Sequence, residues 1–190
     1  MKKYLISAYI LLLSSCGTLF SGTQQAVTIN TNVPEAKVYV NGMPSCTTPC
    51  AVNLKRTSNN VFVILKKDGY IDVTAPLTSE INPISIINLS NPYSWTTDYL
   101  TGGVWRYSPD SVYLEMEKKK MTKAEADHFK QSSQIRRFVL FNFHSLKTGS
   151  LEHLHSLSGL TGLNEKQISE VLRPCNNEIE AVNRILNFAG

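Results

Sequence analysis

The apolar residues of this chain change their spacing once, between residues 117 and 122. Before that point apolar and polar residues alternate in short stretches, whereas after it apolar residues recur every three or four positions. Alternation is typical of strands with one buried face, and a period of 3.6 residues is typical of helices. The chain is therefore predicted to be an α+β protein, with a small β module at 24–117 and a helical domain at 118–190.

The β module is predicted from short alternating strands separated by turn signals. The strands are expected at residues 27–31, 36–40, 50–54, 61–65 and 112–117. Asn41-Gly42 is a strong hairpin signal, because both residues tolerate positive φ, and Asn59-Asn60 marks a second turn. Short strands at this spacing favour a small antiparallel, β-sandwich-like module, to which the last strand returns.

An ordered series of turn and strand residues runs through the same segment. Its members are Pro34, Ala36, Val38, Val40, Asn41, Gly42, Thr48, Pro49, Lys67, Gly69 and Tyr70. In this order they resemble a PEGA domain, whose pattern is a proline-centred turn, a V-x-V-[DN]-G turn, a T-P step and a K-x-G-Y ending. Glu35 stands where the family usually has glycine, and glutamate adopts positive φ only at a cost. The resemblance implies a non-catalytic module of an extracytoplasmic protein, with a structural or binding role.

The N-terminus has the layout of a secretory signal peptide. Two lysines precede an apolar run at 5–13 that is too short to span a bilayer. The sequence Leu-Ser-Ser-Cys at 13–16 resembles the lipobox of bacterial lipoproteins. That resemblance implies cleavage before Cys16, with residues 1–15 as the signal peptide and 16–23 as a lipidated linker. A buried N-terminal helix or strand is the alternative.

Lipidation at Cys16, palmitate included, would make the membrane the first partner of this chain. Gly17 follows the cysteine, where aspartate in enteric bacteria usually means inner-membrane retention, so the resemblance points to the outer membrane, facing the periplasm or the cell surface. Without residues 1–15 the chain keeps 175 residues (190 − 15), and its net charge falls from +4 to +2 because Lys2 and Lys3 are lost. A charge so close to neutral argues against nucleic acid binding.

Four cysteines are present: Cys16, Cys46, Cys50 and Cys175. Cys46 and Cys50 lie in a segment that is expected to be a loop, and in an oxidising compartment they favour a structural disulfide. A zinc site would need further ligands nearby, and a redox pair normally uses C-x-x-C. Metal binding and free thiols are the alternatives. Cys175 is then left as an unpaired thiol.

Residues 93–107 contain both tryptophans of the chain. The pattern D-x-x-T-G-G-x-W-x-Y at 98–107 resembles a segment of small bacterial lipoproteins that carry a PEGA-like unit. In one interpretation the aromatic side chains complete the core of a small sheet. In the other, Trp95, Tyr99, Trp105 and Tyr107 form an exposed surface for a partner or for the membrane interface, both of which favour tryptophan and tyrosine.

Four helices are predicted after residue 118. Thr122 and Glu125 form a capping box for a first helix that should run to about Lys147. The later helices are expected to begin near Ser150, Asn164 and either Asn176 or Asn177. Short connections between helices with one apolar face predict a compact four-helix domain.

Four histidines, His128, His144, His153 and His155, lie in the helical half. His153 and His155 are two positions apart, so on a helix they point to different sides and make a poor metal pair. No nucleophile motif or phosphate loop is found, so we predict no catalytic residue, cofactor or metal site. The expected function is a non-catalytic structural, binding or assembly role in the envelope, with another envelope protein or the cell wall as partner. The alternative is a periplasmic enzyme or metal-binding protein that uses the histidine-bearing helices.

Overall fold

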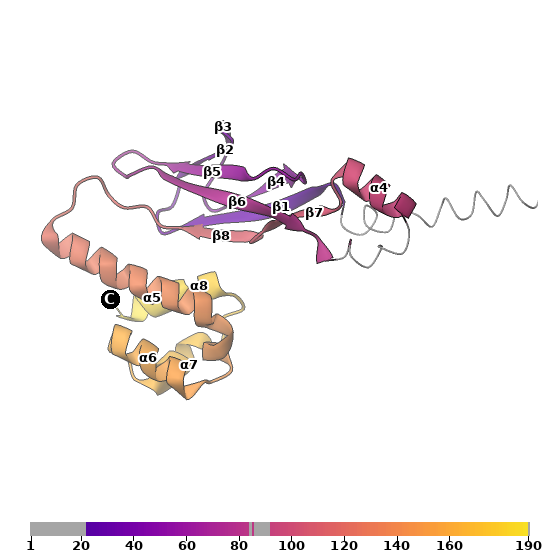
Figure 1. Cartoon of the computed structure of the whole chain (residues 1–190). Helices are drawn as coiled ribbons and strands as arrows, with labels where there is room; N and C mark the ends of the chain where they lie inside the picture. Colours follow the sequence, from indigo (N-terminus) through magenta and orange to yellow (C-terminus); the bar gives the residue numbers. More distant parts are fainter. Residues whose placement is uncertain (1–21, 84, 86–91, 190) are drawn as a thin grey trace, which may run out of the picture. The chain divides into compact units, whose positions relative to one another are not determined.

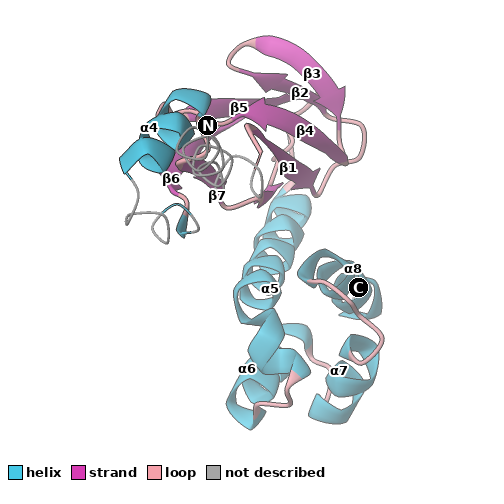
Figure 2. Cartoon of the chain, turned by 90° about the vertical axis from the view of Figure 1, so that its right-hand side faces the viewer, coloured by secondary structure: helices cyan, strands magenta, loops and turns pink. Residues whose placement is uncertain are grey.

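The structure is a computed structural model that describes residues 22–83, 85 and 92–189. The chain divides into two compact units, and the boundary in the sequence falls between Lys119 and Lys120. The first contains the strands and the second contains only helices, as Figures 1 and 2 show. The α+β class and the order of a β region followed by a helical region are confirmed.

The β unit contains two sheets among the described residues. The strands are β1 (Gln24–Thr31), β2 (Lys37–Val40), β3 (Met43–Thr47), β4 (Cys50–Lys55), β5 (Val61–Lys66), β6 (Val73–Ile81), β7 (Trp105–Ser108) and β8 (Ser111–Leu114). One sheet has the order β4-β1-β8 and the other β3-β2-β5-β6-β7. A helix, α4 (Pro92–Thr101), precedes β7.

The core of the β unit is shared by the two sheets. Its fully buried side chains include Val27 and Ile29 from β1, Val38 from β2, Val63 and Leu65 from β5, and Leu77 from β6. These residues alternate with exposed neighbours along β1 and β5, because successive strand side chains point to opposite faces. Burial of both inner faces gives the unit its sandwich-like form.

One pairing differs from the expected antiparallel arrangement. β8 pairs with β1 in parallel, with Thr28 opposite Ser111 and Thr31 opposite Leu114. The chain reaches this position by crossing between sheets, since β7 extends the five-stranded sheet and β8 extends the three-stranded sheet. The strand also ends at Leu114, earlier than the alternation to residue 117 predicted.

Two positive-φ turns fit the sequence pattern. Glu35 adopts a φ of 56°, so the glutamate takes up the left-handed conformation for which the PEGA pattern uses glycine. Asn41 and Gly42, with φ of 49° and 83°, form the turn between β2 and β3. The Asn41 side chain adds a link to β5, because its Oδ1 accepts a hydrogen bond from the Phe62 N–H at 2.9 Å.

The helical unit contains α5 (Lys123–Lys147), α6 (Leu151–Thr161), α7 (Glu165–Leu172) and α8 (Glu178–Ala189). The capping box of Thr122 and Glu125 is confirmed, and Asn164 forms a second one with Gln167. Ser150 precedes α6 as expected but makes no side-chain cap hydrogen bond. The four helices enclose a separate core of Ile135, Val139, Leu146, Leu154, Leu157, Ile168, Val171, Leu172, Cys175, Ala181, Val182 and Ile185. Within the described part of the chain, none of the helices has the length and apolarity needed to cross a membrane.

Candidate functional site

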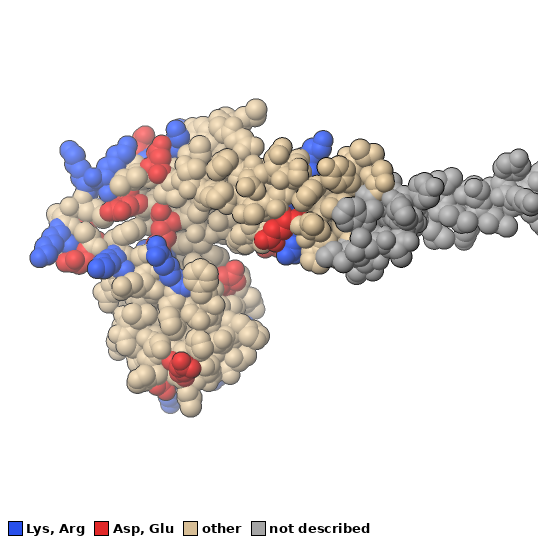
Figure 3. Space-filling model, viewed as in Figure 1, with Lys and Arg blue, Asp and Glu red and all other residues tan. Residues whose placement is uncertain are grey.

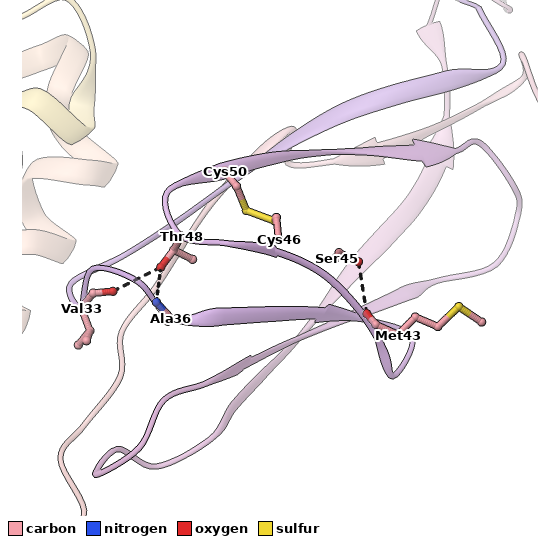
Figure 4. Close-up of a disulfide and its surroundings, with 7 residues drawn as sticks. All are labelled: Val33, Ala36, Met43, Ser45, Cys46, Thr48 and Cys50. Atoms are coloured by element: carbon pink, nitrogen blue, oxygen red, sulfur yellow. Dashed lines mark hydrogen bonds between the residues drawn. A yellow bond between two sulfur atoms is a disulfide. The ribbon is translucent and has the colours of Figure 1, made fainter.

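Cys46 and Cys50 form a disulfide that joins the two sheets (Figure 4). Cys46 lies in β3 opposite Val38, and Cys50 begins β4 opposite Ile29. Their Cα atoms are 6.4 Å apart, which is within the range that a disulfide bridges. The predicted pairing is therefore confirmed, although Cys46 lies in a short edge strand and not in a loop.

Thr48 fixes the chain between the two cysteines (Figure 4). Its Oγ1 accepts a hydrogen bond from the Ala36 N–H at 3.0 Å and donates to the Val33 carbonyl at 3.4 Å. The Thr48 backbone exchanges two more bonds with the same turn, from its N–H to the Ala36 carbonyl and from the Glu35 N–H to its own carbonyl. Thr48, the threonine of the T-P step in the PEGA pattern, is buried, and its hydrogen bonds stabilise the turn around Glu35.

An exposed apolar surface lies at the end of the β unit that carries α4. Ile81 pairs with Trp105 across β6 and β7, and the rings of Trp105 and Tyr99 are 6.4 Å apart between centroids. Tyr99 is 58% exposed, Leu100 79% and Ile81 48%, while Trp105 is partly buried. We call Ile81, Tyr99, Leu100 and Trp105 the α4-end patch.

Tyr107 does not belong to this surface, which corrects one residue of the predicted set. Its ring is buried in the core of the β unit, and its hydroxyl donates to the Lys55 carbonyl at 3.0 Å. Tyr107 lies two positions after Trp105 in β7, and its ring is part of the core of the β unit. The core interpretation therefore holds for Tyr107, while Tyr99 is exposed, and contact of the exposed residues with a partner or a membrane stays a prediction.

Gly102 links the α4-end patch to the start of the described chain through contacts with Arg56. Its φ is +86°, and a Cβ at this position would lie 2.3 Å from the Arg56 carbonyl oxygen. The Arg56 N–H donates to the Thr23 carbonyl at 2.9 Å, so Thr23 and Gly102 both contact the backbone of one residue. Gly102 in turn accepts a hydrogen bond from the Trp105 N–H at 3.0 Å. Only glycine permits this approach.

Two arginines lie at the same end of the β unit. Nε and Nη1 of Arg56 are buried and have no hydrogen-bond partner among the described residues. Burial, and secondly the charge of Arg106, lowers the pKa of Arg56. Arg106 follows Trp105, and its Nη2 lies 3.7 Å from Glu80 Oε2. Sequence reasoning missed both arginines because nothing in the sequence signals their proximity.

On the face of the β unit seen in Figure 3, acidic and basic side chains are interspersed and form no continuous area of one charge. Around α4 on that face, most side chains are neither acidic nor basic. The α4-end patch is therefore distinguished from its surroundings by apolar and aromatic character more than by charge.

The remaining candidates lie in the helical unit. Cys175 is buried in the helical core, and its Sγ–H donates to the Val171 carbonyl at 3.3 Å. His153 Nδ1 lies 2.8 Å from Ser150 Oγ, whereas His155 Nδ1 lies 3.3 Å from Glu165 Oε1, so the two rings have different partners. Residues 22–83, 85 and 92–189 contain no group of three or more His, Cys, Asp or Glu side chains placed to hold a metal ion.

Two predicted site residues are not placed by the structure. Cys16 lies outside the described residues. Trp95 lies in α4, but its side chain is outside the described part.

The first unit is thus a two-sheet β domain that a disulfide fastens at the corner where its sheets meet. Residues 24–83 match the PEGA domain family, which extends the resemblance through β6. α4, β7 and β8 lie beyond the matched residues, so this chain adds a helix and one strand per sheet to the PEGA-like domain. Comparisons with curated proteins and with solved structures gave no match.

Proposed function

We propose that this chain is a lipid-anchored envelope lipoprotein with a non-catalytic structural, binding or assembly role. Cleavage before Cys16 makes this cysteine the first residue of the mature protein, and the lipid on it is the membrane anchor. The destination is the outer membrane, with the two units facing the periplasm or the cell surface. The binding partner is another envelope protein or the cell wall.

The observation that carries this proposal is the Cys46–Cys50 disulfide. Structural disulfides persist in oxidising compartments such as the bacterial periplasm and are rare in the cytosol. The basic residues, the apolar run and the lipobox-like 13–16 segment supply the matching export signal. A PEGA-like domain supports the same compartment, because the family is typical of extracytoplasmic proteins.

The anchor has to hold the protein for longer than a single acyl chain would. One acyl chain gives only marginal, reversible membrane binding, whereas two or more hold a protein durably. Diacylation of the Cys16 thiol and acylation of its new amino group meet this requirement. No membrane-spanning helix is then needed for attachment.

The test is metabolic labelling of the full-length chain with a palmitate analogue in a bacterial host. The unchanged chain is expected to take up label, lose residues 1–15 and fractionate with membranes. Cys16→Ser should abolish the label and leave an uncleaved or soluble precursor, whereas Cys175→Ser, the matched control, should be labelled normally. Normal labelling or normal membrane retention of Cys16→Ser would overturn the proposal.

A further inference from the structure

We propose that the α4-end patch, made of Ile81, Tyr99, Leu100 and Trp105, inserts into the interface of the phospholipid bilayer to which Cys16 anchors the chain. This inference rests on the proposed lipidation of Cys16. It adds a second contact with the same membrane and assigns a role to α4 and β7, which lie beyond the PEGA match.

The tether between the lipid and the β unit is short. Cys16 and Gly22, the first described residue, are separated by six residue steps (22 − 16). A fully extended chain spans at most about 3.6 Å per residue, so the six steps reach about 20 Å. Whatever part of the β unit lies beside Gly22 must therefore remain within about 20 Å of the lipid.

The α4-end patch is the part of the β unit that lies beside the start of the described chain. Thr23 bonds to Arg56, Gly102 packs on the carbonyl of Arg56, and Gly102 bonds to Trp105. Figure 1 shows the same relationship, with α4 at the end of the sheets at which β1 begins. The tether thus holds the α4-end patch, and not the opposite end of the sheets, close to the bilayer.

The side chains of the α4-end patch are of the types that favour a membrane–water interface. Tyrosine and tryptophan are enriched at membrane–water interfaces, because one end of each side chain is apolar and the other can hydrogen-bond. Leu100 and Ile81 add exposed aliphatic area beside the two rings, which gains free energy on leaving water.

The consequence is a fixed orientation of the β unit. A lipid anchor alone leaves the unit free to rotate on its tether, whereas a second contact would direct its α4 end towards the bilayer. The turn before Ile71, which lies at the opposite end of β6 from Ile81, would then point away from the membrane and remain available to a partner.

The experiment uses the full, lipidated chain, purified from membranes and reconstituted into vesicles of phosphatidylethanolamine and phosphatidylglycerol. The readout is quenching of tryptophan emission by phospholipids that are brominated near the top of the acyl chain. Both tryptophans of the chain, Trp95 and Trp105, lie in α4 or β7, so the signal reports on this end alone. Docking predicts strong quenching in brominated vesicles compared with unbrominated ones.

The chain offers closely matched variants. Ile81→Ser with Leu100→Ser removes apolar side chains that are 48% and 79% exposed in the patch. Ile71→Ser with Met43→Ser removes side chains that are 47% and 72% exposed elsewhere. Ile71 lies just before the nine-residue strand β6, and Ile81 is the last residue of that strand. The two side chains are therefore about 30 Å apart along the strand. Met43 lies in β3, the edge strand opposite β7 in the same sheet.

The patch variant is expected to lower the ratio of docked to undocked protein about tenfold, while the control variant quenches like the unchanged chain. All forms should keep the lipid on Cys16. A lipidated chain whose emission is not quenched, or equal quenching of both double variants, would overturn the docking and leave the anchor standing. In that case the patch would serve a protein partner. Absence of lipid on Cys16 would overturn both proposals.

Discussion

The side-chain amide of Gln25 exchanges two hydrogen bonds with the backbone of Tyr107. Its Nε2 donates to the Tyr107 carbonyl at 2.8 Å, and its Oε1 accepts from the Tyr107 N–H at 2.9 Å. Asn32 repeats this arrangement with Met116, at 3.0 and 2.8 Å. The two amides flank the parallel pairing of β1 with β8, so side chains extend the ladder at both ends.

Asn32→Ala should destabilise the β unit by about 2 kcal/mol or more, because it leaves the N–H and C=O of the buried Met116 unpaired. Asn53→Ala, which truncates an exposed side chain on β4, is the matched control and should change stability by less than about 0.5 kcal/mol. Urea unfolding followed by tryptophan emission measures both, since both tryptophans lie in this unit. Equal midpoints for the two variants would show that the amide does not support β8.

Gly102→Ala should destabilise the β unit by about 3 kcal/mol or more, since the new methyl group would overlap the Arg56 carbonyl. Gly69→Ala separates the clash from the backbone effect. Gly69 has nearly the same φ, +84° against +86°, but no atom within 4 Å of its Cβ position. It should therefore lose only about 1 kcal/mol. The same urea experiment compares them, and losses of similar size would mean that the close contact between Gly102 and Arg56 has little energetic effect.

The Cys46–Cys50 disulfide should contribute roughly 2 kcal/mol to the stability of the β unit, by the chain-entropy model for a five-residue loop. Reductant should therefore lower the urea midpoint of the unchanged chain and leave the midpoint of Cys46→Ser/Cys50→Ser unaffected. In the native, unreduced protein neither cysteine should react with an alkylating reagent. Rapid alkylation of Cys46 before reduction would contradict the pairing.

Cys175 should react slowly with thiol reagents in the native protein and quickly once the helical unit unfolds. Burial, followed by the charge of Glu180, raises the pKa of this thiol above its ordinary value of 9.0. The folded state therefore favours the neutral thiol, so this contribution to stability is complete below pH 9 and is lost as pH rises further. Helical circular dichroism during urea unfolding at pH 8 and pH 10 measures the change. Cys175→Ser should show a smaller decrease between the two pH values, and an equal decrease would show that the thiol is not responsible.

Trypsin should cut the folded chain first next to Lys120. The division into units falls between Lys119 and Lys120, and all three lysines at 118–120 are exposed. Lys118 and Lys119 are bound to the β unit, since Lys118 bridges to Tyr70 and the Lys119 N–H donates to the Gly69 carbonyl at 2.9 Å. Mass spectrometry of early fragments should find a helical piece that begins at Met121. First cleavage after Arg106 would instead show that the aromatic segment opens before the linker.

Much of the molecule was determined by local sequence. The change of apolar period set the α+β order, because strand and helix bury faces with different spacings. The caps at Thr122 and Asn164 could be predicted because each involves two residues only three positions apart. The hairpin at Asn41-Gly42 could be predicted for a similar reason, since its φ angles depend on two adjacent residues. The disulfide was predicted from spacing and from the inferred compartment.

Only the tertiary structure decided the contacts between distant residues. Gln25 and Tyr107 are 82 positions apart, and neither residue type signals a bond to the other. The strands β3 and β6 were not predicted, because they contain Pro44 and Pro76. Proline is tolerated in a strand only where the ladder does not need its N–H, and the sequence does not show which positions those are. Tyr107 and Tyr99 belong to one aromatic segment, yet one is core and the other surface. Tyr107 is buried because β7 joins the five-stranded sheet and adds this ring to the core, whereas Tyr99 lies in α4 outside that sheet, and both placements are set by packing across the whole unit.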